Sequence, residues 1–253
     1  MAEGDTILRL ARRFESQLAG ERVAVSAPNP RGRAAGVERL DGLVLESADA
    51  HGKHLLLRFG SLVLHSHLGM SGGWHLYAPS ARWRRPRSSA WAVLAAPAQV
   101  AVQFGGPTLR VLSAERARRD PQLASLGPDV LAPDFAPAAV AAAMRADPTR
   151  TVGDALLDQR LLAGVGNIFK SEACFAARVD PWAPLGELSD ERLQDVLVAA
   201  REQMLEAVEG GRKTFAVYRR RGPCPACGGR LASRGQGDAN RTTYWCPRCQ
   251  SRA

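Results

Sequence analysis

The chain has 253 residues, of which 45% are hydrophobic and 23% charged, so it can bury a core and is not a disordered tail protein. No apolar run approaches the roughly 18 residues of a membrane span, and the acidic start has no hydrophobic signal core. We therefore expect a cytoplasmic protein without a membrane partner. The formal net charge of +9 lies entirely in residues 212–253, which carry ten Lys and Arg against the single acid Asp238. This segment is either a solvated basic tail or a surface for a polyanion such as nucleic acid.

The first half of the chain combines one helix with many short strands. Residues Thr6–Leu18 repeat apolar side chains at helical spacing, which predicts an amphipathic helix. The strand-like runs that follow, most bounded by Gly, Pro or Asp, predict a β-sandwich or flattened barrel, and Arg82–Arg87 predicts an exposed basic loop. The predicted strands are Val23–Ser26, Leu43–Ser47, His54–Phe59, Leu62–His67, Trp74–Tyr77, Trp91–Ala95, Val100–Phe104 and Leu109–Leu112.

From Ser113 to about Val208 the pattern becomes helical, and a short unit rich in Gly, Pro, Arg and Cys closes the chain. The sequence therefore predicts an α+β protein of three domains, over residues 1–115, 116–212 and 213–253. The predicted helices of the second domain are Ala138–Met144, Val152–Leu162, Ile168–Ala177 and Ser189–Val208.

Four of the five cysteines form two CxxC pairs, Cys224 with Cys227 and Cys246 with Cys249, separated by 18 residues. This spacing is typical of a four-thiolate zinc site, and four thiolates leave no open coordination position. We therefore expect one structural Zn²⁺, with disulfides as the alternative that a reducing compartment disfavours. The fifth cysteine, Cys174, lies in an apolar helix and is interpreted as a core residue.

Between the cysteine pairs, Leu231–Ser233 and Thr242–Trp245 alternate like the strands of a hairpin, with Gly235–Asn240 as its tip. Arg241 follows this tip, where a guanidinium could bind a phosphate with two parallel hydrogen bonds.

A glycine-rich turn precedes the predicted helix that begins at Ile168. Gly164 and Gly166 permit a tight backbone path, and Asn167 is predicted as the N-cap. A helix N-terminus attracts anions, and Lys170 in the first turn would suit a nearby phosphate. The alternative is an ordinary pair of antiparallel helices.

The N-terminus offers a nucleophile. Met1 should be removed before the small Ala2, which leaves a free α-amine next to Glu3. An α-amine has a pKa of about 7.7–8.0, so roughly a tenth of it is already neutral and nucleophilic at pH 7 and can form a Schiff base. The adjacent carboxyl group can exchange protons with the reacting groups.

Five separated motifs occur in a characteristic order and cover essentially the whole chain. They resemble the bacterial formamidopyrimidine-DNA glycosylase and endonuclease VIII family. The opening motif, Glu3–Thr6, is more similar to the endonuclease VIII branch, and the third motif, His67–Gly72, is more similar to the formamidopyrimidine branch. The motifs are Glu3-Gly-Asp-Thr6, His51-Gly-Lys53, His67-Leu-Gly-Met-Ser-Gly72, Gly164-Val-Gly-Asn167, and the cysteine pairs with Arg241-Thr-Thr-Tyr-Trp-Cys-Pro-Arg-Cys-Gln250.

The resemblance implies a helix–two-turns–helix, a zinc-finger hairpin, and a nucleoid-associated monomer that acts on damaged double-stranded DNA. It implies removal of an oxidised base, pyrimidines favoured, by Schiff-base chemistry, followed by β,δ-elimination. By motif, Ala2 would be the nucleophile, Glu3 would move protons at the sugar, and Lys53 would assist elimination. The remaining implied roles are phosphate binding for Asn167 and Arg241, δ-elimination for Arg241, and filling of the vacated stack by Met70.

One residue departs from the family pattern, because Ala2 stands where the family has proline. A primary amine gives an imine that must be protonated before it acts as an electron sink, and alanine lacks the ring that fixes φ. The alternative reading is therefore a protein that binds damaged DNA with weakened or lost lyase activity. A zinc-ribbon adaptor would leave Glu3 and Lys53 without a role, and a zinc hydrolase would need an open metal position.

Overall fold

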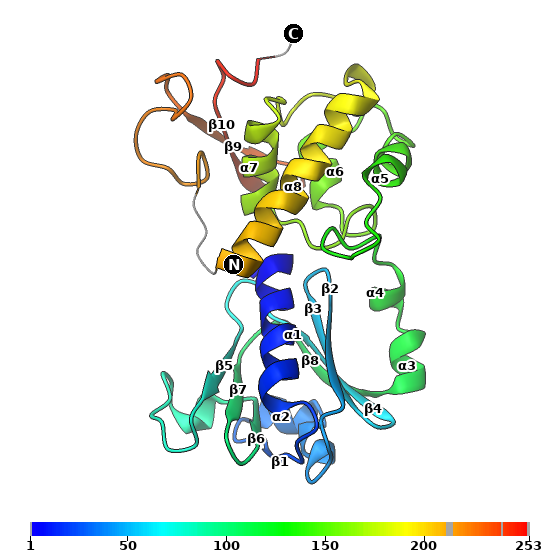
Figure 1. Cartoon of the computed structure of the whole chain (residues 1–253), viewed down its shortest axis with the longest axis vertical. Helices are drawn as coiled ribbons and strands as arrows, with labels where there is room; N and C mark the ends of the chain where they lie inside the picture. The colour runs from blue at the N-terminus through cyan, green and yellow to red at the C-terminus, as the bar shows by residue number, and fades with distance from the viewer. Residues whose placement is uncertain (1, 211–214, 239, 252–253) are drawn as a thin grey trace. The chain divides into compact units, whose positions relative to one another are not determined.

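The computed structural model describes residues 2–210, 215–238 and 240–251 (Figure 1). Met1, whose removal the sequence predicts, lies outside these ranges. The chain divides into two compact units, Met1–Ser125 and Leu126–Ala253. Within the described ranges, the helices are all too short or too polar to span a bilayer.

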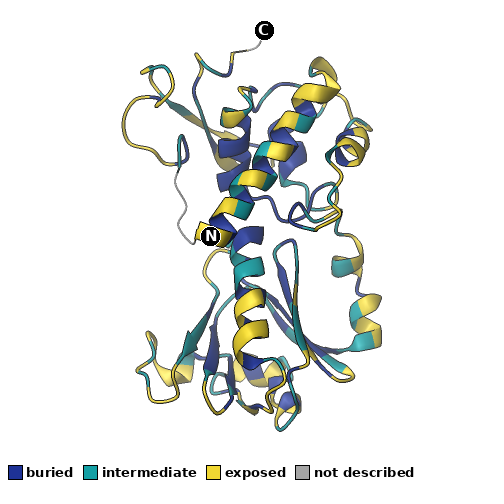
Figure 2. Cartoon of the chain, viewed as in Figure 1, coloured by how far each residue is buried: buried dark blue, intermediate teal, exposed yellow. Residues whose placement is uncertain are grey.

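The first unit consists of helix α1 (Gly4–Leu18) and two four-stranded antiparallel sheets, with the strand orders β2-β3-β4-β8 and β1-β6-β7-β5. Helix α1 packs against β2 and β3 through its apolar face, and Figure 2 shows its opposite face exposed. The buried Phe14 ring meets Trp74 edge-on, with ring centroids 5.1 Å apart. These sheets confirm the predicted β-sandwich. The strands are β1 (Ala24–Ser26), β2 (Ser47–His51), β3 (His54–Phe59), β4 (Leu62–His67), β5 (Gly73–Tyr77), β6 (Ala92–Ala95), β7 (Val100–Phe104) and β8 (Thr108–Ser113).

Short helices connect the strands of this unit and follow its last strand. They are α2 (Pro30–Ala34), α3 (Ala114–Arg118) and α4 (Pro121–Ala124), with 3-10 turns η1 (Val37–Leu40) and η2 (Arg87–Ser89).

One predicted strand of this unit is misplaced. The sequence predicts a strand over Leu43–Ser47, but β2 begins at Ser47 and the preceding residues make a single bridge, between Arg22 and Val44. The alternating leucines at 43 and 45 have the period of a strand, but an extended segment with one bridge satisfies the same alternation.

The second unit is built from helices and a two-stranded hairpin. Helix α7 (Asn167–Ala176) packs against α6, α8 and β10, and Figure 2 shows it buried along most of its length. The other elements are α5 (Pro137–Met144), α6 (Val152–Leu157), η3 (Leu185–Glu187), α8 (Asp190–Gly210), β9 (Ala232–Gln236) and β10 (Arg241–Trp245).

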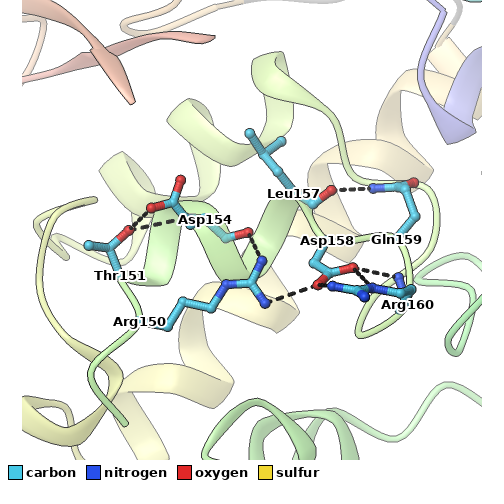
Figure 3. A network of polar contacts seen from close by, with 7 residues as sticks. All are labelled: Arg150, Thr151, Asp154, Leu157, Asp158, Gln159 and Arg160. Atoms are coloured by element: carbon cyan, nitrogen blue, oxygen red, sulfur yellow. Dashed lines mark hydrogen bonds and ion pairs between the residues drawn. The ribbon is translucent and has the colours of Figure 1, made fainter. Parts of the chain in front are cut away.

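Helix α6 ends at Leu157, whereas the sequence predicts that it continues to Leu162. Asp158 caps its C-terminus in an extended conformation, with φ −74° and ψ 104°. Its carboxylate accepts hydrogen bonds from Arg150 (3.0 Å) and Arg160 (2.7 Å), as Figure 3 shows. These two ion pairs stabilise Asp158 in its extended conformation, and residues 158–166 form the connection between α6 and α7.

Candidate active site and metal centre

The four paired cysteines converge on one point. The Sγ atoms of Cys224, Cys227, Cys246 and Cys249 all lie within 4.8 Å of one another, and all four residues are free thiols rather than disulfides. The pair Cys224–Cys249 is 3.8 Å apart and the pair Cys227–Cys246 is 3.5 Å apart. Tetrahedral zinc with sulfur at about 2.3 Å requires sulfur–sulfur distances of roughly 3.8 Å. The set therefore fits one Zn²⁺, and because all four positions are thiolates the zinc is structural.

The hairpin between the cysteine pairs is formed by β9 and β10, with Arg241 paired to Gln236. Its turn is shorter than the predicted tip, because β9 continues through Gly235 to Gln236. Gly237 and Asn240 have positive φ values of 66° and 45°, which close the turn. The exposed Arg241 side chain stands at the first position of β10, directly after this turn.

Helix α7 holds the hairpin by two polar side chains from its first turn. The Asn167 amide donates to the Thr242 carbonyl at 2.7 Å. The wholly buried Lys170 ammonium donates to Thr243 Oγ1 at 2.5 Å and to Gln236 Oε1 at 3.3 Å. These contacts fix the two residues that follow Arg241.

One prediction for this helix changes accordingly. The N-cap is Gly166, in an extended conformation, and Asn167 is the first helical residue. The prediction of Asn167 as N-cap is wrong because its side chain bonds a strand 75 residues away instead of its own first turn. Lys170 is fully buried against the hairpin, and its contact with DNA stays a prediction.

The glycine turn before α7 is braced by Gln159. Its amide nitrogen donates to the carbonyls of Leu157 and Val165, each at 3.0 Å, and its carbonyl accepts from the Gly164 amide at 3.1 Å. Gly164 has φ 103°, which requires glycine. Hydrogen bonding to Arg160 keeps the pKa of the neighbouring Asp158 well below its usual range, so the Asp158 carboxylate stays ionised (Figure 3).

In the first unit, Ala2 and Glu3 lie at the N-terminal end of α1. Ala2 is partly buried against the core, and Glu3 is fully buried. The Glu3 carbonyl accepts from the amides of Thr6 (3.0 Å) and Ile7 (3.2 Å), so the helix begins at Gly4, two residues earlier than predicted. The positive end of the helix dipole favours a carboxylate at this position.

Two turns of the first unit carry the other candidate residues. Gly52 and Lys53 form the two-residue turn between β2 and β3, where Gly52 has φ 56° as a type II′ turn requires of its first residue. Met70 lies in the turn after β4 and is 60% exposed, a large exposure for an apolar side chain.

The sequence interpretation missed a buried histidine cluster beside the Lys53 turn. His54 Nδ1 lies 2.7 Å from His65 Nε2, and the His54 and His67 rings are 4.8 Å apart. Burial and the Lys53 charge lower the pKa of His67. The alternation of histidines at 65 and 67 places both on one strand face, which is the sequence signal that could have found the cluster.

Two further predictions concern residues outside these sites. Cys174 is fully buried, and burial raises the pKa of its thiol to about 12, which fits the predicted core role rather than a nucleophile. The stretch Arg82–Arg87 forms an exposed loop, in which the Arg87 guanidinium lies 4.4 Å from the centre of the Trp83 ring.

Comparison with family profiles divides the chain into three matched segments. Residues 1–113 match the formamidopyrimidine-DNA glycosylase N-terminal domain, and residues 126–218 match the formamidopyrimidine-DNA glycosylase H2TH domain. Residues 222–252 match a zinc finger found in FPG and IleRS.

Individual relatives show the same pattern over nearly the full length. The chain is 40% identical to a probable endonuclease 8 2 of Streptomyces coelicolor, over 99% of this chain and 94% of that protein. It is 36% identical to the DNA-(apurinic or apyrimidinic site) lyase Nei2 of Mycolicibacterium smegmatis, over 99% of both chains. The fold is that of a solved Lactococcus lactis formamidopyrimidine-DNA glycosylase, crystallised with abasic-site DNA, with a TM-score of 0.85 at 21% identity over 99% of this chain and 100% of the other.

Proposed function

The chain belongs to the formamidopyrimidine-DNA glycosylase and endonuclease VIII family, and we propose that it is a base-excision-repair enzyme that removes oxidised bases from double-stranded DNA and cuts the abasic strand. The observation that carries the proposal is the 40% identity to a probable endonuclease over 99% of the chain, with Ala2 and Glu3 at the N-terminus of α1. A zinc-ribbon adaptor would not need the first unit at all.

The proposed nucleophile is the α-amine of Ala2. Its nitrogen forms a bond to C1′ of the damaged nucleotide while the bond from C1′ to the base breaks, and the departing base takes up a proton. Glu3 protonates the ring oxygen O4′, so that the C1′–O4′ bond breaks and an imine remains. Loss of the C2′ proton expels the 3′-phosphate, and loss of the C4′ proton then expels the 5′-phosphate. The buried Glu3 carboxyl group supports this role because it is adjacent to the amine in sequence.

Cationic and polar residues are proposed to bind the phosphates. Lys53 projects from a two-residue turn and would assist the first elimination beside the 3′-phosphate. Arg241 and Asn167 would bind phosphates that flank the lesion, and Arg241 would assist the second elimination. The exposure of Arg241 and the excess charge of residues 212–253 support this assignment. Met70 would enter the stack after the nucleotide rotates out, and its exposure supports that role.

A second candidate function follows from Ala2 alone. Its primary amine forms an imine that must gain a proton, whereas the family's proline gives an iminium at once. Under this alternative the protein binds damaged or abasic DNA with weak or absent lyase activity.

Borohydride trapping on abasic-site DNA separates the two functions. The enzyme should give a covalent adduct that disappears when the α-amine is blocked, and Ala2→Pro should trap at least as fast. The matched variant Glu3→Gln should still trap on a preformed abasic site, whose sugar already opens spontaneously, but should lose excision of a damaged base. DNA binding without an adduct would favour the second function. Intact mass spectrometry would refute the Ala2 nucleophile if Met1 were retained or Ala2 acetylated.

The finer assignments need separate measurements. We propose a preference for oxidised pyrimidines from the opening motif, and an incision panel with thymine glycol, dihydrouracil and 8-oxoguanine tests it. A faster incision of 8-oxoguanine would overturn the preference. We also propose a monomer, which sedimentation of the zinc-loaded protein tests directly.

A further inference from the structure

A chain of four polar side chains, three buried and Arg110 about a third exposed, runs along one face of the β2-β3-β4-β8 sheet and ends beside the Lys53 turn. Strand pairing brings these side chains together. His54 of β3 lies opposite His67 of β4, and His65, two residues earlier on the same face of β4, lies opposite Arg110 of β8. His54 is 4% exposed and His65 is fully buried. Buried polar groups of this kind are costly unless each one is hydrogen-bonded.

Each member of the chain has a defined partner. Asp120 Oδ1 accepts from Arg110 Nη2 at 2.7 Å, and Arg110 Nε donates to His65 Nδ1 at 3.1 Å. His65 Nε2 in turn lies 2.7 Å from His54 Nδ1. Asp120 is itself fixed as the N-cap of α4, where it accepts from the Leu123 amide at 3.2 Å. We call Asp120, Arg110, His65 and His54 the histidine relay.

The chemistry of the donors determines where the protons are. A guanidinium group only donates, so His65 Nδ1 must be unprotonated and His65 must carry its proton on Nε2. That N–H can only donate to His54 Nδ1, so His54 also carries its proton on Nε2. Both rings are then neutral. Burial, with neighbouring positive charge, agrees with this state, because it lowers the pKa of His65 to about 4 and that of His54 to about 3.

We propose that the histidine relay positions Lys53 for the elimination step, an inference that rests on the role given to Lys53 in the proposed function. His54 follows Lys53 directly in the sequence and pairs with His51 across the turn. Because the His65 ring holds the His54 ring, it also holds the strand end from which Lys53 projects. Because both rings are neutral, they add no positive charge near the Lys53 ammonium, whose own charge helps to lower the pKa of His67. Loss of the relay would remove one of the contacts that hold this strand end in place.

The tautomers can be measured without any substitution. Long-range ¹⁵N–¹H correlation spectra of the full zinc-loaded chain, labelled with ¹⁵N-histidine, should show His54 and His65 as neutral Nε2–H tautomers at pH 7. Either ring found protonated at pH 7, or as the Nδ1–H tautomer, would overturn the relay. This measurement is independent of activity, so it also decides the relay if the proposed function fails.

The positioning role is tested with Arg110→Met against Arg58→Met. Arg58 also pairs with an aspartate on this sheet, Asp49 at 2.9 Å, but both side chains are about half exposed and the ion pair lies outside the histidine relay. In single-turnover assays on abasic-site DNA, Arg110→Met should slow strand cleavage about 10-fold to 100-fold, as expected for a displaced catalytic group. Borohydride trapping, which reports imine formation at Ala2, should change by less than about 2-fold. Arg58→Met should change neither rate by more than about 2-fold.

The outcomes separate positioning from mere stability. Equal losses of trapping and cleavage in Arg110→Met, or unchanged cleavage, would overturn the proposal. If Arg110→Met does not fold, Asp120→Asn, which keeps the size and the hydrogen-bond acceptor, replaces it in the same assays. A wild-type protein that neither traps nor cleaves would refute the proposed function instead, and the tautomer spectra would still stand.

Discussion

Replacing Thr243 with valine removes a buried hydroxyl group but keeps the size and shape of the side chain. Thr243 is fully buried, and its Oγ1 accepts from the Lys170 ammonium and donates to Gln236 Oε1 at 2.7 Å. A hydrogen bond to a charged group contributes about 1.5–3 kcal/mol and a neutral one about 0.5–1.5 kcal/mol. Because both partners stay buried, we expect Thr243→Val to lower the free energy of unfolding by about 2–4 kcal/mol.

The adjacent residue provides a matched control. Thr242 has an exposed side chain, and Thr242→Val keeps the backbone carbonyl that accepts from Asn167. We expect this variant to stay within about 0.5 kcal/mol of the wild type. Urea unfolding of the zinc-loaded proteins, followed by near-ultraviolet circular dichroism, measures both values. Equal stabilities for the two variants would refute the assignment of Lys170, Thr243 and Gln236 to one buried network.

Three further predictions follow from the sites. Arg241→Gln should weaken binding to abasic-site duplex by about 1–3 kcal/mol and reduce the slope of log Kd against log salt concentration by about 0.9, since one phosphate contact is lost; an unchanged slope in a salt titration would contradict that contact. Cys249→Ser or a strong chelator should unfold the hairpin and abolish tight DNA binding, which zinc analysis and binding assays measure on the same samples; full affinity without zinc would show that the finger is dispensable. Because the pKa values of His54 and His65 are lowered from 6.5 to about 3 and 4, the unfolded chain binds protons first as the pH falls. Their contribution to stability is therefore complete above about pH 6.5 and decreases toward pH 4, by at most about 1.4 kcal/mol per pH unit for each histidine. Urea unfolding between pH 7 and pH 4 checks this, and a stability that is independent of pH over that range would contradict it.

Sequence alone determined the features that depend on short-range spacing. The zinc ligands were found because two residues between cysteines allow one turn to place both sulfurs on one ion. The strands His54–Phe59 and Leu62–His67 have the predicted bounds, because two short runs of strand-like composition separated by the two residues Gly60 and Ser61 define them locally. The proposed roles of Ala2, Glu3, Lys53, Met70 and Arg241 also come from motifs, and they stay predictions until the trapping and binding assays are done.

Tertiary structure decided what the polar side chains of these elements do. Local rules predict Asn167 as an N-cap and Lys170 as a cation near a phosphate, but their side chains also bond residues 75 and 73 positions away in the hairpin. The histidine relay likewise depends on which strands pair, since Arg110 meets His65 only through the pairing of β4 with β8. The physical reason is that a hydrogen bond to a distant strand competes with the local one, and local propensity contains no information about which strand will be there.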